Sequence, residues 1–400
     1  MSWIYARLKD IATIIMGQSP KSEHFNYEGE GMPFMQGKTE FGKFSPSIVK
    51  YTTKTTRVAK NNSILFTVRA PVGALNIANQ DICIGRGLAS IDSNDGDNYF
   101  LYYLIKNHHS LFLSESGEGV YDSINKTNLN NVKLFIPSNI DLRKKIGAIL
   151  GAYDDLIENN LKRIKLLEKA AQNIYSEWFV NMRFPGHENI PINEETGLPE
   201  GWKDSELDSV ATVQSSKRVF LADYVDDGVP FFRGKEISQK AKHENVSEPY
   251  FISQEKFKEF DSKWGSPKEN DILITAVGTI GNCYLVRKSD LPFYFKDGNL
   301  LWIHSCNQNI SGLYLIQYFQ SPIFKGVLNS ISIGSSQKAL TISAVKKLNI
   351  TIPDIETLEK FNSIIKPIVK QIEVMTNMMI QLKAARDILL PRLMNRTIEV

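Results

Sequence analysis

The sequence DLRKKIGAILGAYDDLIENNLKRIKLLEKAAQNIYSEWF, residues 141–179, carries apolar side chains at alternating spacings of four and three residues. A period of about 3.5 residues keeps such a stripe facing a partner helix, whereas the stripe of an ordinary surface helix drifts around the axis. The stretch therefore predicts a long coiled-coil helix. Its seam contains Ile146, Leu150, Tyr153, Ile157, Asn160, Ile164 and Leu167, and continues through Ala171, Ile174 and Trp178.

The C-terminal part of the chain repeats this alternation and supplies the expected partner helix. Its seam contains Phe361, Ile365, Ile368, Ile372, Met375, Met379 and Leu382, and continues through Arg386, Leu389 and Leu393. A continuous chain that returns on itself most easily makes the two helices antiparallel. Asn160 and Arg386 are polar members of the seam, so they either fix register or contact a partner protein, or the seam is open to solvent there. Trp178 and Phe179, at the end of the first helix, are expected to pack internally.

The rest of the sequence is repeated as well. GMPFMQGK, residues 31–38, reappears as GVPFFRGK, residues 228–235, and KNNSILFT, residues 60–67, corresponds to KENDILIT, residues 268–275. Each member of the second pair predicts a strand that runs into a turn with glycine's permissive backbone. An Ile-Pro pair precedes each long helix, and proline disfavours helix in the residue before it. Each long helix is therefore expected to start afresh beyond its Ile-Pro pair.

These repeats predict an α+β fold with two similar globular domains, two long antiparallel coiled-coil helices and a pseudo-twofold internal repeat. The expected boundaries are 1–139 for the first globular domain, 140–182 for the first long helix, 183–201 for a connector, 202–354 for the second globular domain and 355–400 for the second long helix.

Composition and charge describe an ordinary globular protein. The chain has 400 residues, of which 42% are hydrophobic and 23% charged, and its formal net charge is +3. No run approaches the roughly 18 apolar residues of a membrane span, and charged residues occupy the start where a signal peptide needs an apolar core. We therefore expect a cytoplasmic protein. Three scattered cysteines argue against both a disulfide framework and a zinc site.

Catalytic signatures are missing from the sequence. It has no G-x-x-x-x-G-K-[ST] phosphate loop, no dinucleotide fingerprint and no Asp/Asn-Pro-Pro-Tyr/Phe motif. Its histidines show no pairing typical of metal ligands. Residues 335–338, SSQK, fit the S-x-x-K spacing of serine acylases but lack the companion motifs. We expect no catalytic residue and no metal ligand in this chain.

Several segments resemble the specificity (S) subunits of type I restriction-modification systems. ILFTVRAPVG, residues 64–73, and DICIGRGLA, residues 81–89, resemble a stretch typical of their target recognition domains. LPEGWK, residues 198–203, is similar to the entry to the second such domain. WFV at 178–180 and RFPGHE at 183–188 are similar to the family's sequence after the first long helix, and LLPRL at 389–393 is similar to its C-terminal helix end. The likeness covers essentially the whole chain, in the family's order.

The resemblance implies that each globular domain is a target recognition domain reading one half of a bipartite, asymmetric site in double-stranded DNA, without catalysis by this chain. It also implies that the long helices set the spacer and dock two methyltransferase (M) subunits. Those would carry S-adenosylmethionine, while restriction (R) subunits would add ATP- and magnesium-dependent translocation and cleavage. No cofactor is expected in this chain, and no membrane partner.

DNA contacts are expected from loop residues with bidentate donors or positive charge. In the first domain these are Gln18, Lys21, Gln36, Lys38, Arg69 and Arg86. In the second they are Arg233, Lys235 and Thr275 at corresponding positions, with Lys217, Arg218, Gln337 and Lys338 from nearby loops. A structural salt bridge or a solvated side chain is the alternative for Lys38 and Arg86. Val277 corresponds to Arg69, which argues against a common base-contact role of that position in the two domains.

Two other functions remain open at this point. The chain could be a scaffold whose globular ends bind proteins, or a self-sufficient DNA-modifying enzyme that binds S-adenosylmethionine alone.

Overall fold

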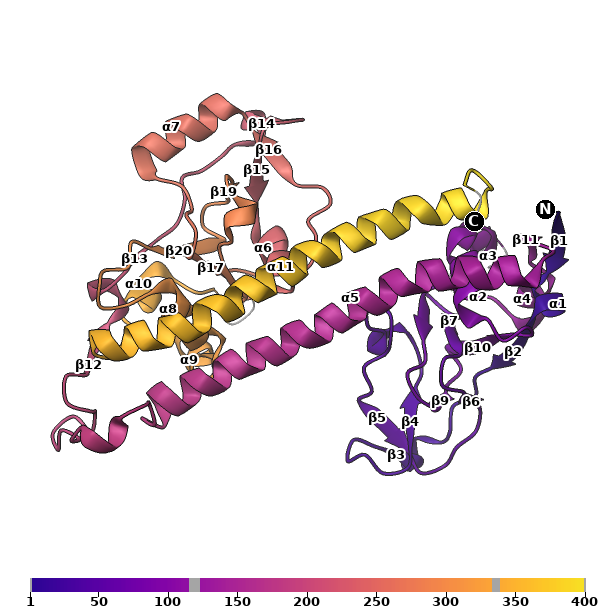
Figure 1. Cartoon of the computed structure of the whole chain (residues 1–400), viewed down its shortest axis with the longest axis horizontal. Helices are drawn as coiled ribbons and strands as arrows, with labels where there is room; N and C mark the ends of the chain where they lie inside the picture. Colours follow the sequence, from indigo (N-terminus) through magenta and orange to yellow (C-terminus); the bar gives the residue numbers. More distant parts are fainter. Residues whose placement is uncertain (1, 115–122, 333–338, 399–400) are drawn as a thin grey trace. The chain divides into compact units, whose positions relative to one another are not determined.

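The computed structural model describes residues 2–114, 123–332 and 339–398 (Figure 1). The chain divides into two compact units, Met1–Asn160 with Gln381–Val400, and Leu161–Ile380. Two long helices, α5 (Ile140–Tyr175) and α11 (Ile355–Met394), contribute residues to both units. α5 continues into a π-helical turn, Ser176–Val180.

The described residues of the first unit form three sheets. Strands β1 (Trp3–Arg7) and β11 (Lys133–Pro137) form an antiparallel pair. An antiparallel sheet has the order β2 (Ala12–Met16), β10 (Leu88–Ser93), β7 (Ile64–Thr67), β8 (Leu75–Ile77). The third has the order β3 (Phe25–Asn26), β5 (Lys50–Thr52), β4 (Met32–Met35), β9 (Ile82–Ile84), β6 (Val58–Ala59). The first unit also contains the shorter helices α1 (Leu8–Ile11), α2 (Asn98–Asn107), α3 (His109–Ser114) and α4 (Lys126–Asn131).

The described residues of the second unit form three corresponding sheets, the third with four strands rather than five. Strands β12 (Lys203–Glu206) and β21 (Asn349–Ile352) pair, and β13 (Thr212–Gln214), β20 (Leu300–His304), β17 (Ile272–Thr275) and β18 (Cys283–Leu285) follow in the order of the first antiparallel sheet. The third sheet is β14 (Tyr224–Val225), β16 (Tyr250–Ile252), β15 (Val229–Phe232), β19 (Tyr294–Phe295). The second unit also contains the shorter helices α6 (Gly234–Ala241), α7 (Gln254–Trp264), α8 (Gly312–Gln320), α9 (Pro322–Ile331) and α10 (Ile342–Lys346).

The repeat extends to single hydrogen bonds. The hydroxyl of Thr67 donates to the carbonyl of Pro71 and accepts from the amide of Ala74, at 2.6 and 2.8 Å. Thr275 makes the equivalent pair of bonds in the turn after β17. Each turn contains a glycine with positive φ, 87° at Gly73 and 83° at Gly281, a conformation that residues with a Cβ rarely adopt. The pseudo-twofold α+β repeat predicted from the sequence is thus confirmed.

The seam of the long helices is buried within each unit. In the first, Ile146 and Leu150 of α5 share a core with Leu390 and Leu393 of α11. In the second, Trp178, which follows α5, packs against Phe361 with the ring centroids 5.9 Å apart. The start of one helix therefore packs on the end of the other, as antiparallel pairing requires. Every predicted seam residue from 146 to 167 and from 361 to 382 is buried or partly buried.

The polar seam residues correct one interpretation. Asn160 and Arg386 are 5% and 8% exposed, so the seam is not open to solvent at either position. The Arg386 guanidinium pairs with the carboxylate of Asp154 on α5, which is 3% exposed. Tyr103 of α2 donates its hydroxyl hydrogen to the same carboxylate. Burial and then the charge of Asp154 raise the pKa of Tyr103, which keeps this hydroxyl protonated. The group links the first globular domain to both long helices.

His243 forms the corresponding link in the second unit. Its Nδ1 accepts from Nη2 of Arg287 at 2.8 Å, so its Nε2 carries the proton and donates to Oε1 of Glu168, also at 2.8 Å. Thr376 of α11 lies 3.1 Å from the same Nδ1. Because Glu168 lies on α5, one imidazole joins the second globular domain to both helices.

The end of α5 is an aromatic cluster. Phe179 packs edge-on against Tyr314 and Phe361, with ring centroids 4.8 and 4.9 Å apart. Trp178 and Phe179 are 8% and 5% exposed. The prediction that these two side chains pack internally is confirmed.

Candidate nucleic-acid interface

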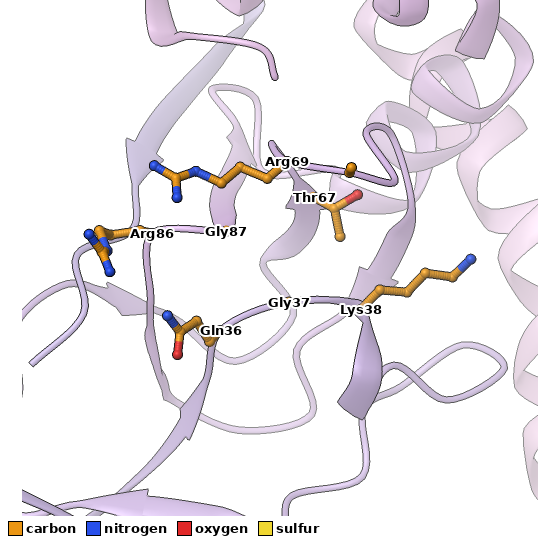
Figure 2. Close-up of a pocket in the computed structure, with 8 residues that line it drawn as sticks. Gln36, Gly37, Lys38, Thr67, Arg69, Arg86 and Gly87 are labelled. Carbon is orange, nitrogen blue, oxygen red and sulfur yellow. The ribbon is translucent and has the colours of Figure 1, made fainter. Parts of the chain in front are cut away.

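A pocket of about 160 Å³ lies among three loops of the first unit (Figure 2). Gln36, Lys38, Arg69 and Arg86 line it, so four of the six predicted contacts in this domain come together. The loops follow β4 and β7 and join β9 to β10. Figure 2 shows the side chains of Arg69, Arg86 and Gln36 on one side of the pocket, with Lys38 pointing away from them.

Backbone hydrogen bonds fix the three loops to one another. The amide of Gly85 donates to the carbonyl of Met35 at 2.7 Å, and that of Val68 donates to the carbonyl of Gly87 at 2.9 Å. A Cβ on Gly87 would lie 2.2 Å from the carbonyl oxygen of Gln36. Glycine is therefore required for this approach, which holds the loop of Arg86 beside that of Gln36.

Among the described residues, the cations of the pocket have no carboxylate partner. Lys38, Arg69 and Arg86 are all exposed, and within the described ranges no carboxylate lies within 4.0 Å of their charged groups. The salt-bridge alternative for Lys38 and Arg86 therefore finds no partner in that part of the chain. Such cations suit phosphate oxygens and the acceptors of base edges.

The two remaining candidates of the first domain lie outside the pocket lining. Gln18 is exposed, and its backbone amide donates to the carbonyl of Ile84 at 2.8 Å. The next residue, Ser19, accepts the amide of Arg86 at 3.2 Å, which places Gln18 beside the pocket loops. Lys21 is 81% exposed and lies 3.9 Å from Glu23, a weak surface pair.

The second domain holds its candidate arginines in ion pairs. Arg233 follows β15 and donates from Nε and Nη2 to the carboxylate of Glu236, at 3.1 and 2.8 Å. Its guanidinium also stacks on Tyr250, 4.2 Å from the ring centroid. Burial alone would raise the pKa of Glu236, but the hydrogen bonds from Arg233 outweigh it and hold that pKa below its usual value. Arg218 pairs with Asp297 at 3.1 Å.

Two candidate lysines of the second domain, Lys217 and Lys235, are exposed. Lys235 lies beside Arg233 in the first turn of α6, and Lys217 places its ammonium 5.5 Å from the ring centroid of Trp264. Thr275 differs from the other candidates because its side chain is 1% exposed and its hydroxyl is used in the turn. A contact from Thr275 to DNA would require that turn to open, so its burial does not support the predicted role. Gln337 and Lys338 lie outside the described residues.

Sequence reasoning missed the exposed aromatic residues of the second domain. Tyr250 and Trp264 are 41% and 39% exposed, and each lies under a cation. The adjacent pair Lys263 and Trp264 was the sequence signal that could have indicated this surface. Exposed aromatic rings beside basic groups are common where proteins contact nucleic acids.

Within the described part of the chain, no group of three His, Cys, Asp or Glu residues is arranged to hold a metal ion. None of the described helices is both long enough and apolar enough to span a membrane.

The sequence profile of the type I restriction modification DNA specificity domain matches residues 2–169 and again residues 199–384. The chain belongs to this family. Membership confirms the predicted resemblance, and the family's role is DNA recognition rather than catalysis. The two matched ranges coincide with the two copies of the internal repeat.

Individual relatives carry the same designation. The type I restriction enzyme MjaIX specificity subunit of Methanocaldococcus jannaschii is 27% identical over 407 aligned positions, covering 98% of this chain and 92% of the relative. A second protein of that organism, provisionally named MjaX specificity subunit, is 45% identical over 163 residues. That match covers 40% of this chain and 38% of the relative. The crystal structure of an S subunit from M. genitalium aligns with a TM-score of 0.65 at 15% identity, over 98% of this chain and 96% of the other, which supports the fold.

Proposed function

We propose that each globular domain reads one half of a bipartite, asymmetric target in double-stranded DNA. The observation that carries this proposal is the internal repeat, which presents equivalent loops twice with different side chains on them. Equivalent loops support one binding mode for both domains. Different side chains support two different half-sites, because sequence is read by side chains at base edges.

The charges of the candidate loops support the same proposal. Lys38, Arg69 and Arg86 in the first domain and Lys235 in the second offer cationic groups to phosphates. Each phosphate contact releases counterions, so affinity should fall steeply with salt. A scaffold that binds only proteins has no reason to show that dependence together with sequence preference.

We further infer that α5 and α11 set the spacer between the half-sites and dock two methyltransferase subunits. Helices of 36 and 40 residues are about 54 and 60 Å long at about 1.5 Å per residue. Both also expose large apolar side chains: Leu156, Leu166 and Ile388 are 49, 67 and 54% exposed. Partner subunits would remove such surface from water. S-adenosylmethionine would be bound by the M subunits, while ATP and magnesium would serve R subunits that join through the complex.

Selection from a random duplex library tests the proposal. The full chain, purified with its M subunit, should enrich one split sequence, two defined blocks separated by a fixed number of unspecified base pairs. If the chain were a protein-binding scaffold, no split sequence would be enriched. Titration calorimetry of the chain alone with S-adenosylmethionine tests the remaining alternative, a self-sufficient DNA-modifying enzyme. Heat of binding would favour that enzyme over the proposed function.

A further inference from the structure

One position of the repeat carries a different base-reading side chain in each copy. Gln36 is the first residue after β4, and Arg233 is the first residue after β15. In both copies, the strand pairs with a parallel strand. The backbone carbonyl of its last residue accepts a hydrogen bond from the backbone amide of the first residue after that parallel strand. These bonds run from Gly85 to Met35 at 2.7 Å and from Lys296 to Phe232 at 2.9 Å. Gln36 and Arg233 are therefore structurally equivalent as well as aligned in sequence.

Arg233 is held in a fixed orientation. The carboxylate of Glu236, which is 2% exposed, accepts hydrogen bonds from Nε and Nη2 of Arg233. It also accepts one from the backbone amide of Arg233 at 2.9 Å. Tyr250 supports one face of the guanidinium. Glu236 therefore occupies the edge of the guanidinium formed by Nε and Nη2. The terminal edge, formed by Nη1 and the second hydrogen of Nη2, takes no part in this interaction. The arginine side chain remains 33% exposed.

Two residues further on, both copies carry the same side chain, Lys38 and Lys235, and both lysines are exposed. An identical cation in two domains with different half-sites suits the phosphate backbone, which is the same in every sequence. Position 36/233 differs where position 38/235 does not. It is therefore the better candidate for reading bases.

We propose that Gln36 specifies an A·T pair in the first half-site and that Arg233, positioned by Glu236, specifies a G·C pair at the equivalent place in the second. A glutamine amide matches N6 and N7 of adenine, and the terminal edge of a guanidinium matches O6 and N7 of guanine in the major groove. The inference rests on the proposed function, because it assigns one base pair within each half-site.

Library selection with variants of the full chain, in complex with the M subunit, tests the assignment. Arg233→Ala should relax the preference for guanine at one position of the second half-site by about 10- to 100-fold and leave the first half-site unchanged. Arg233→Gln should move that preference to adenine, and Gln36→Arg should introduce guanine in the first half-site. Glu236→Gln should partly relax the same position as Arg233→Ala, which a merely structural role of Glu236 would not do.

Lys235→Gln is the matched control, because it removes a neighbouring exposed cation. It should weaken binding to all sequences alike and lower the salt dependence. Thermal unfolding of each variant verifies folding, and Gln36→Arg, at an exposed position, keeps the proposal testable if the Arg233 variants unfold. The assignment is refuted if wild type enriches a split site while folded variants at 36 and 233 leave every base preference unchanged. Failure of wild type to enrich any split site would instead refute the proposed function.

Discussion

Removing one heptad from each long helix tests whether the helices measure the distance between the half-sites. Residues 157–163 and 377–383 are the suitable segments, because their removal keeps the Asp154–Arg386 pair and the His243 contacts to Glu168 and Thr376. Seven helical residues correspond to about 10 Å, or roughly three base-pair steps. A heptad also preserves the phase of the seam, so the two helices should still pair.

Three base pairs also rotate the DNA by about 100°, since a turn contains roughly 10.5 base pairs. The variant should therefore lose modification of the original target and favour a spacer about three base pairs shorter, with weaker binding because the grooves are out of phase. Sequencing the methylated adenines in cells that carry the variant and its M subunit measures the spacer directly. Methylation of the original spacing by a folded variant would show that the helices are not the ruler.

Three further predictions concern stability. Asp154→Leu leaves Arg386 with only the half-exposed Asp387, at 2.7 Å, and should cost about 3 kcal/mol, the low end for breaking a buried pair. Asp154→Leu with Arg386→Leu should be close to wild type. Urea unfolding compares the two variants, and equal losses of unfolding free energy would contradict a buried pair. His243→Leu should increase hydrogen exchange in 234–243 without changing 98–107, and uniform exchange rates would argue against a local link. The folded-state pKa of Glu236 is depressed, so its carboxylate stabilises the fold above the unfolded pKa, and this contribution disappears as pH falls through the folded value. Glu236→Gln should lose that part of the acid sensitivity, measured by unfolding at pH 7 and below pH 4.

The sequence was most informative where one periodicity governs many residues. The alternation of four and three along residues 146–178 has a single packing solution, and its copy at 361–393 identifies the partner. The repeated ILFT and ILIT segments predicted equivalent strands because both are bounded by the same turn residues. Such signals are local, and tertiary contacts reinforce them.

Helices α6 and α7 could not be predicted in the same way. Their apolar positions are few, and each helix begins at a polar cap, Glu236 bonding back to the amide of Arg233 and Ser253 accepting from Lys256. The aligned segment of the first domain, with the same Gly-Lys pair, forms only a short 3-10 turn, Lys38–Glu40. The role of Thr275 was equally hidden, because a hydroxyl that satisfies a turn has the same sequence signature as one that contacts a phosphate.

The Asp154–Arg386 pair breaks the symmetry of the repeat. In the two aligned long helices, the counterpart of Arg386 is Ala171, and the counterpart of Asp154 is Val369. If two copies of α5 paired with each other, Asp154 would face an alanine, and in a pair of α11 helices Arg386 would face a valine. Either arrangement loses the buried Asp154–Arg386 pair, at a cost of several kcal/mol. One ion pair thus makes the two halves of a symmetric sequence complementary rather than interchangeable, and favours the pairing of α5 with α11 over the pairing of either helix with a copy of itself.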